Sequence, residues 1–423
     1  MKRRPILATV LSVGSALLLA GALAGTAAAA SPGLDPAFGN GGIVRLDSLL
    51  PRGVKALGEG GSQPAPDGST YGLARAKRCA GRCSEYLFHF RPSGRLDRSF
   101  GYRGLVRLPD HETGSRYALG IDAQGRPVVT QGKHGAKVLR FTKAGRPDRS
   151  FGHDGKVWLP KMERNPATVQ PLPGGGLLLS SEDIDGTGGF ALIRLAELHE
   201  NGRPMRTFSD DGFVAVGAPG TFHLPPAPTR HGSVLIAAEG CCTELVSVVR
   251  VSKRGRLDRR FNREARRSLA PLDRMESEHF LAELDAYDLV ARSDGGADLF
   301  GNFGNHGFEV RIAGDGRPVA GFGRRGIRRS ARPVNFALPL RGGGFFAFGE
   351  GYFGPLRAFV LGPGGSPDRR FPAIPISPWS VAMAATETAS DMIQVTFDRR
   401  REVGEPDVAY AARFVLPHGL VSR

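Results

Sequence analysis

The stretch GRLDRSFG at residues 94–101 decides the fold, because variants of it recur along the whole chain. The other copies read GLDPAFG at 33–39, GRPDRSFG at 145–152, GRPMRTFS at 202–209, GRLDRRFN at 255–262, GRPVAGFG at 316–323 and GSPDRRFP at 365–372. Every copy contains one phenylalanine: Phe38, Phe100, Phe151, Phe208, Phe261, Phe322 and Phe371. The gaps between them drift from 49 to 62 residues. This spacing is typical of propeller blades rather than of helical or leucine-rich repeats.

The repeat that follows Phe100 shows the structure of one unit. It divides into four short apolar runs, at residues 117–122, 127–130, 137–141 and 156–159, separated by glycine-rich turns. Four antiparallel strands joined by tight turns make one propeller blade. The glycine turn after the first run recurs in all units except the last, VAMAATETASDMIQVTFD, where strand-like runs flank a turn without glycine.

The two ends of the chain complement one another. The last unit supplies three strands and stops after the run at 410–416, while GLDPAFGNGGIVRLD at 33–47 is a fourth strand with no blade before it. We expect residues 43–46 to pair with 412–416, since closing the ring removes exposed sheet edges. The sequence therefore predicts an all-β fold: one closed seven-bladed β-propeller of four-stranded antiparallel blades over residues 31–423.

The recurring motif GRLDRSFG and its variants, which we call the phrase, have a structural role in this fold. Its glycine permits a turn, its aspartate accepts backbone N–H groups, and its phenylalanine ring is expected to be buried between blades. The aspartate is absent from the copies ending at Phe208 and Phe322. Arginines lie between apolar residues in the third strand of five units, at Arg140, Arg194, Arg250, Arg311 and Arg413. A charge buried there needs a partner, and we expect it to be a phrase aspartate.

The phrase, its spacing and the glycine-turn strand pairs resemble the delta-60 repeat of secreted bacterial proteins. The resemblance covers essentially the whole chain after residue 30 and implies a β-propeller. It implies no catalytic residues.

The first thirty residues predict an export signal. Lys2, Arg3 and Arg4 precede an uncharged stretch at 5–30 that ends in TAAAA, as in a secretory signal peptide. An uncleaved membrane anchor is the alternative, because the stretch is long enough to span a bilayer. We expect a secreted or cell-envelope-associated protein, monomeric and free of the membrane after cleavage.

The chain is strongly basic, with 57 Lys and Arg against 41 Asp and Glu, and loses only three of those basic residues with the signal. Such a charge attracts anionic cell-envelope polymers, acidic glycans or DNA. The arginines are spread along the chain without interleaved aromatic residues of the kind that stack on bases. A solvated basic surface is therefore favoured over a dedicated polyanion site, and no specific nucleic-acid binding is expected.

All four cysteines fall between the second and third runs of their units: Cys79, Cys83, Cys241 and Cys242. In an exported protein we expect disulfides between Cys79 and Cys83 and between Cys241 and Cys242. A zinc site is the alternative, but the two pairs belong to units far apart around the ring. Neither a metal nor a cofactor is expected.

Two sets of connections lie at opposite faces of such a ring. The turns between first and second strands and the phrase share one face, while the loops between second and third strands and between blades share the other. Variable loops on a rigid scaffold carry function in many folds. The candidate binding residues on that loop face are His111, His134, Asp183, Asp185 and His306. The segment MESEHFLAEL at 275–284 predicts the one helix outside the signal.

Two functions from different classes are compatible with these features. The favoured one is a secreted binding or scaffold protein whose loop face engages a cell-envelope polymer, a glycan or a protein. The alternative is an extracellular hydrolase or lyase with acid–base residues at the mouth of the central channel. The sequence contains no nucleophile elbow, phosphate-binding loop or nucleotide fingerprint, so catalysis is not favoured.

Overall fold

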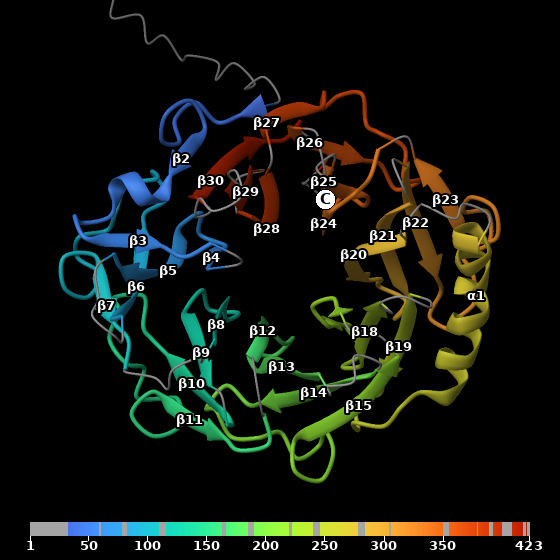
Figure 1. Cartoon of the computed structure of the whole chain (residues 1–423), viewed down its shortest axis with the longest axis horizontal. Coiled ribbons are helices and arrows are strands. Elements are labelled where there is room, and N and C mark those ends of the chain that lie inside the picture. Colours follow the sequence, from blue (N-terminus) through green and yellow to red (C-terminus); the bar gives the residue numbers. More distant parts are fainter. Residues whose placement is uncertain are drawn as a thin grey trace, which may run out of the picture. The chain divides into compact units, whose positions relative to one another are not determined.

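Seven antiparallel sheets surround a common centre in the computed structural model (Figure 1). It describes residues 33–58, 61–77, 83–109, 116–132, 134–162, 166–184, 190–219, 222–239, 246–277, 284–303, 306–330, 332–349, 355–378, 380–388, 392–399, 408–417 and 420. The predicted seven-bladed β-propeller is confirmed. In blade 2 the strands match the predicted runs to within two residues at every end.

The blades follow one another in chain order around the ring (Figure 1). Blade 1 contains β3 (Val54–Ala56), β4 (Ser62–Pro64), β5 (Thr70–Ala76), β6 (Glu85–Phe90) and β7 (Leu105–Arg107). Blade 2 contains β8 (Arg116–Ile121), β9 (Pro127–Gly132), β10 (Ala136–Arg140) and β11 (Lys156–Leu159). Blade 3 contains β12 (Pro166–Pro171), β13 (Leu177–Ile184), β14 (Phe190–Leu198) and β15 (Phe213–Pro219).

The second half of the ring has the same order. Blade 4 contains β16 (Phe222–His223), β17 (Ala227–Pro228), β18 (Val234–Glu239) and β19 (Ser247–Val251), followed by helix α1 (Arg259–Ser277). Blade 5 contains β20 (Leu284–Ala291), β21 (Ala297–Phe303), β22 (His306–Ile312) and β23 (Ile327–Ser330). Blade 6 contains β24 (Phe336–Pro339), β25 (Phe345–Gly349), β26 (Pro355–Leu361) and β27 (Ile374–Pro378). Blade 7 contains β28 (Ser380–Glu387), β29 (Met392–Arg399) and β30 (Val408–Val415), with β1 (Gly33–Leu34) and β2 (Ile43–Arg45).

The N-terminal strands close the ring on β30. Ile43 pairs with Ala412 and Arg45 with Tyr410, while Gly33 pairs with Val415. The predicted closure is therefore confirmed, with two short strands in place of one and with the predicted fourth residue, Leu46, beginning the short helix η1 (Leu46–Leu49).

One backbone hydrogen bond repeats at the start of every phrase copy. In blade 2 the N–H of Asp148 donates to the carbonyl of Arg140 at 2.9 Å. The equivalent pairs in blade order are Asp97–His89, Met205–Glu197, Asp258–Arg250, Val319–Arg311, Asp368–Val360 and Asp35–Arg413, all between 2.7 and 3.0 Å. These bonds identify one equivalent position in the third strand of each blade, which we call the clasp position.

Where arginine occupies the clasp position, it ties its blade to the next. Arg140 Nε donates to Asp148 at 2.9 Å, its Nη1 donates to the carbonyl of Glu200 in blade 3 at 2.7 Å, and its guanidinium lies 4.5 Å from the Phe151 ring centre. Arg250, Arg311 and Arg413 stack in the same way on the phenylalanines of their own copies. The expected contact with a phrase aspartate is confirmed for Arg140, Arg250 and Arg413, the last of which lies 3.6 Å from Asp35.

Other residues occupy the clasp position where the sequence departs from this pattern. It holds His89 in blade 1, Glu197 in blade 3 and Val360 in blade 6. Arg194, which the sequence analysis grouped with the others, lies three residues before that position. Arg311, whose phrase copy has Val319 in place of aspartate, pairs instead with Glu309 at 2.8 Å and Asp298 at 3.2 Å.

The phrase phenylalanines are all buried, with exposed fractions of 0–7%. Phe151 packs among Val138 of blade 2 and Val169 and Leu179 of blade 3. Phe208 lies in the same way between blades 3 and 4. The rings therefore fill the seams between blades.

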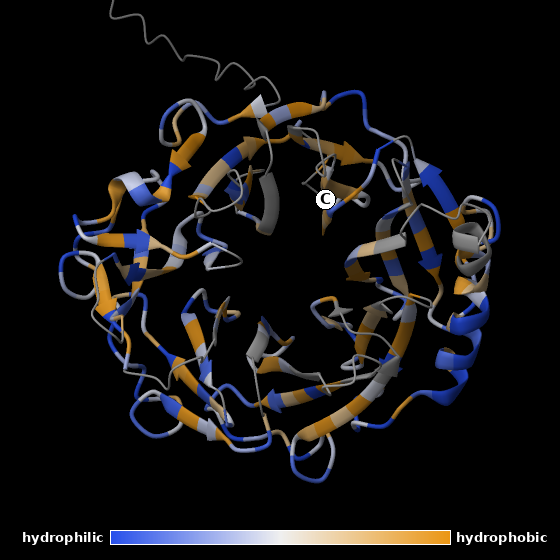
Figure 2. Ribbon diagram, viewed as in Figure 1, coloured by the Kyte–Doolittle hydropathy of each residue, from blue (hydrophilic) through white to orange (hydrophobic). Residues whose placement is uncertain are grey.

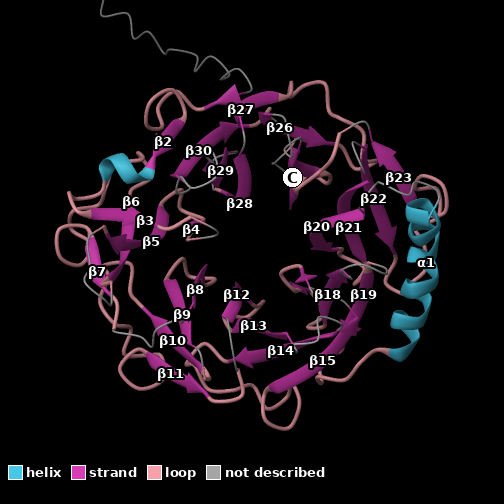
Figure 3. Cartoon of the chain, viewed as in Figure 1, coloured by secondary structure: helices cyan, strands magenta, loops and turns pink. Residues whose placement is uncertain are grey.

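Blade 4 has a different arrangement of strands from the other blades, and the helix that follows it lies earlier in the chain than predicted. In the described residues its inner strand is split into β16 and β17, and α1 follows β19 where the other blades have an outer strand (Figure 3). The prediction of a helix at 275–284 is wrong in its position, because α1 ends at Ser277 and β20 begins at Leu284.

The sequence of α1 explains its position. Asp258 Oδ1 accepts the N–H of Phe261 at 3.0 Å, as an N-cap residue does. Phe261, Ala265, Leu269 and Leu272 follow at helical spacing and are buried. The phrase phenylalanine of blade 4 is therefore also the first apolar contact of the helix.

Candidate binding site

The structure does not bring the predicted binding residues together. His134 is exposed between β9 and β10, and His306 is exposed at the start of β22, three blades away. Asp183 belongs to β13, where its backbone pairs with Leu192. His111 and Asp185 lie outside the described residues, as do Cys79, Cys241 and Cys242, so the disulfide pairings stay predictions. Within the described ranges no three His, Cys, Asp or Glu side chains are grouped to hold a metal ion.

A different site arises from a deletion in blade 6. In blade 2, Val157 of the outer strand pairs with Val138 and follows Phe151 by six residues. The same six-residue interval separates the phrase phenylalanine from the equivalent outer-strand residue in blades 1, 3, 5 and 7, which are Val106, Val214, Arg328 and Val44. In blade 6 the equivalent residue is Ile374, only three residues after Phe371. Blade 6 therefore lacks half of this connection, which we call the phrase loop.

In blades 1, 2, 3, 5 and 7 the phrase loop packs on the start of the phrase. A glycine four residues after the phenylalanine packs so closely that a Cβ added at Gly155 would lie 3.1 Å from Pro147, and one at Gly326 would lie 2.6 Å from Pro318. Gly104 and Gly212 contact the equivalent Leu96 and Pro204. Blade 6 has Pro375 at this distance, already paired with Arg357 in the sheet. Pro367, the equivalent of Pro147, therefore has no glycine four residues after the phenylalanine packed against it.

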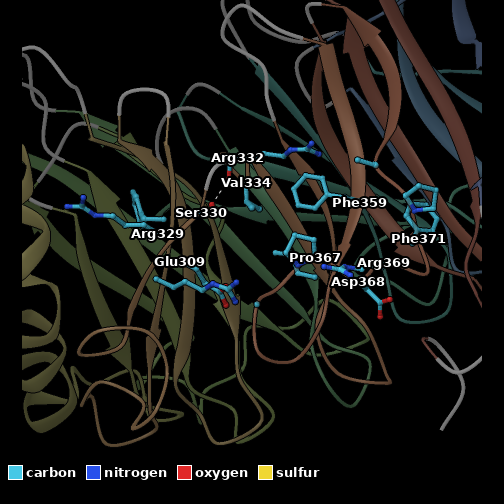
Figure 4. A pocket seen from close by; sticks show the side chains of 16 residues that line it. Glu309, Arg329, Ser330, Arg332, Val334, Phe359, Pro367, Asp368, Arg369 and Phe371 are labelled. Carbon is cyan, nitrogen blue, oxygen red and sulfur yellow. Dashed lines mark hydrogen bonds between the residues drawn. The ribbon is translucent and has the colours of Figure 1, made fainter.

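A pocket of about 510 Å³ lies where that cover is missing, between the outer parts of blades 5 and 6 (Figure 4). Its apolar lining includes Val334, Phe359, Leu361, Pro367 and Ala373. Val334, Phe359 and Leu361 are 4–5% exposed and belong to the core that joins the two blades. The pocket therefore has a rigid apolar floor.

Charged groups surround this floor. Arg328 donates to the carbonyl of Gly364 and, at 3.0 Å, to Ser366 Oγ, so it holds the turn of blade 6 beside blade 5. Burial raises the pKa of Glu309, against the opposing effect of Arg311. Asp368 is paired with Arg370, and this ion pair lowers the pKa of Asp368.

Two exposed arginines among the lining residues form no ion pair with a described residue, Arg329 and Arg369. In Figure 4 the guanidinium of Arg329 points away from Phe359, which leaves Arg369 as the cation at the phrase side. An apolar cavity edged by such a cation suits a ligand with an apolar body and an anionic group.

The sequence contains a signal for this site that did not lead to its prediction. The copy GSPDRRFP is followed by AIP, without the glycine four residues after phenylalanine that most other copies have. A missing glycine looks like ordinary variation between the copies. Only the strand register shows that the phrase loop of blade 6 is three residues shorter than those of the other blades that have one.

Comparison with known proteins finds structural similarity only. No protein-family model and no curated protein sequence matches the chain. Among solved structures it is similar to the β-propeller domain of the Trilobed protease from Pyrococcus furiosus, at 8% identity and a TM-score of 0.47, covering 85% of this chain and 96% of that one. It is also similar to YCF48 bound to D1 peptide, at 10% identity and a TM-score of 0.44, covering 89% and 95%. The fold defines a β-propeller, and these similarities identify no family.

None of the described helices combines the length and apolar character that crossing a membrane requires.

Proposed function

We propose that this protein is an exported binding propeller without catalytic activity, whose pocket between blades 5 and 6 holds a segment of a protein partner. The observation that carries the proposal is the shortened phrase loop of blade 6, which leaves the apolar floor of the pocket without the longer loop that blades 1, 2, 3, 5 and 7 have at this position. The secretory character of residues 1–30 supports export.

The lining of the pocket favours a protein segment over a sugar. Phe359, Leu361 and Val334 form an apolar floor whose side chains have no polar group to receive sugar hydroxyls, and the charged lining residues lie around that floor. Arg369 adds a cation at the edge. A segment with one or two large apolar side chains next to an acidic residue matches both features.

A phage-displayed peptide library tests this proposal. We expect enrichment of peptides in which aspartate or glutamate neighbours leucine or an aromatic residue. Ala373→Trp should fill the pocket and Arg369→Glu should reverse its edge charge, each weakening peptide binding at least about tenfold. Ala144→Trp, at an exposed turn of blade 2, is the matched control and should bind as the native protein does.

Equal binding of the enriched peptides to native protein and both pocket variants would overturn the proposal. So would turnover of glycoside, lactone or uronate polymer substrates by the native protein, since that outcome favours the hydrolase or lyase alternative.

A further inference from the structure

Helix α1 presents a row of arginines on the outside of the ring. Its buried face is held against blade 5, where Ser268 Oγ donates to the carbonyl of Gly316 at 2.9 Å. The opposite face carries five exposed arginines, which we call the arginine ridge: Arg259, Arg260, Arg263, Arg266 and Arg267. Figure 2 shows the N-terminal half of α1 as mostly hydrophilic.

The ridge is poorly neutralised by the protein. Glu264 is its one carboxylate among the described side chains of the helix, and it pairs with Arg267 at 2.9 Å and with Arg263 at 3.5 Å. Arg259, Arg260 and Arg266 form no ion pair with any residue of the described ranges. The preceding turn adds exposed Lys253, Arg254 and Arg256.

Helix stability does not explain these arginines. The first turn of α1 contains no acidic residue, although the helix dipole favours negative charge there. Arg259 and Arg263, like Arg263 and Arg267, are four residues apart and repel each other. A bound anion would offset this repulsion.

The spacing suits a polymer rather than a single ion. Eight residues of helix separate Arg259 from Arg267, about 12 Å along the axis. Guanidinium groups bind phosphate and carboxylate oxygens in a bidentate manner. A chain of repeated anionic groups can contact several members of the ridge at once.

We infer that the arginine ridge of α1 is a docking surface for an anionic polymer bearing phosphate or carboxylate groups. It is a second site, distinct from the pocket between blades 5 and 6. The ring presents it in blade 4 because a helix there replaces the outer strand.

Binding of inorganic polyphosphate and of polygalacturonate to the full mature chain tests the inference, and the two probes distinguish phosphate from carboxylate recognition. The variant replaces Arg259, Arg260, Arg263 and Arg266 by Gln, a good helix former. The matched control replaces Arg95, Arg98, Arg146 and Arg149, exposed arginines of the phrase copies in blades 1 and 2.

We expect the ridge variant to bind at least about tenfold more weakly at about 0.15 M salt, and the slope of log K against log salt to fall by about 3. The control should retain both values. Equal losses in both variants would show that net charge alone attracts the polymer and would overturn the inference, as would tighter binding to anionic lipid vesicles than to either polymer. Peptide binding in the pocket should be unchanged in the ridge variant, so failure of one proposal leaves the other standing.

Discussion

At the scale of single residues, an arginine at the clasp position connects neighbouring blades through hydrogen bonds. Arg250 Nη2 donates to Asp258 at 2.7 Å, while its Nη1 donates to the carbonyls of Gly295 and Gly314 in blade 5 at 2.9 and 2.8 Å. Its guanidinium lies 4.1 Å from the Phe261 ring centre. One side chain thus joins two blades, the phrase and α1.

Arg250→Leu should destabilise the protein by about 3 kcal/mol, because it leaves a half-buried aspartate and two carbonyls without their donor. The lowered melting temperature is measurable by calorimetry. Arg256→Leu, an exposed neighbour, should change stability by less than about 0.5 kcal/mol. An unchanged melting temperature in Arg250→Leu would contradict the clasp.

Glu197, at the clasp position of blade 3, makes the stability of the folded protein depend on pH. Burial raises its pKa to about 7 from an ordinary value of 4.5. The folded state therefore holds the proton more tightly than the unfolded state, and stability present below pH 4.5 is lost as pH rises through about 7. The loss amounts to about 3 kcal/mol.

Glu197→Gln should remove this loss, so denaturant unfolding at pH 5 and pH 8 should give closer stabilities than in the native protein. Asp210→Asn, at an exposed position in the same phrase loop, should leave the native pH dependence intact. A native protein as stable at pH 8 as at pH 5 would show that Glu197 does not titrate as described.

At the scale of elements, the length of the phrase loop in blade 6 explains the pocket between blades 5 and 6. Replacing Pro372 and Ala373 by Gly-His-Asp-Gly-Lys, the sequence at 152–156, would restore the six-residue interval of the other blades. We expect the second glycine of the grafted loop to pack against Pro367, as Gly155 packs against Pro147, and we expect the graft to close the pocket and to leave folding intact. A crystal structure of the graft tests all three. A graft that fails to fold would instead mean that the shorter connection is required by the packing of blade 6.

The element that sequence analysis placed wrongly is also a phrase loop. GRLDRRFN resembles the turn-forming copies, but Asn262 stands where Gly101 and Gly152 adopt positive φ, and Ala265 stands where Gly155 closes the loop. Without these glycines the chain continues as α1. The run at 275–284 contains helix-forming residues, but the helix begins sixteen residues earlier, at Arg259. Phe261 is the first residue of its buried face.

At the scale of the whole molecule, the ring depends on its N-terminal strands. A chain that starts at Asp47 lacks β1, β2 and Phe38, and exposes the backbone edge of β30. Loss of a buried phenylalanine alone costs about 3–5 kcal/mol. We expect this truncated protein to lose cooperative thermal unfolding and to aggregate, as followed by circular dichroism and gel filtration.

A chain that starts at Ser31 is the control and should melt as the full-length protein does. A monomeric truncated chain with the control's melting temperature would mean that closure contributes little to stability.

The sequence by itself determined the number of blades and the closure of the ring, because both depend on a repeated local pattern. Glycine turns, alternating strands and the phrase phenylalanine each act within one unit, so counting the units counts the blades. Only the tertiary structure decided where the proposed binding surfaces lie. The pocket depends on an absent loop beside Pro367, and the arginine ridge on which face of α1 is buried against blade 5. Both arise where neighbouring blades meet, and contacts between blades are not encoded by spacing within either one.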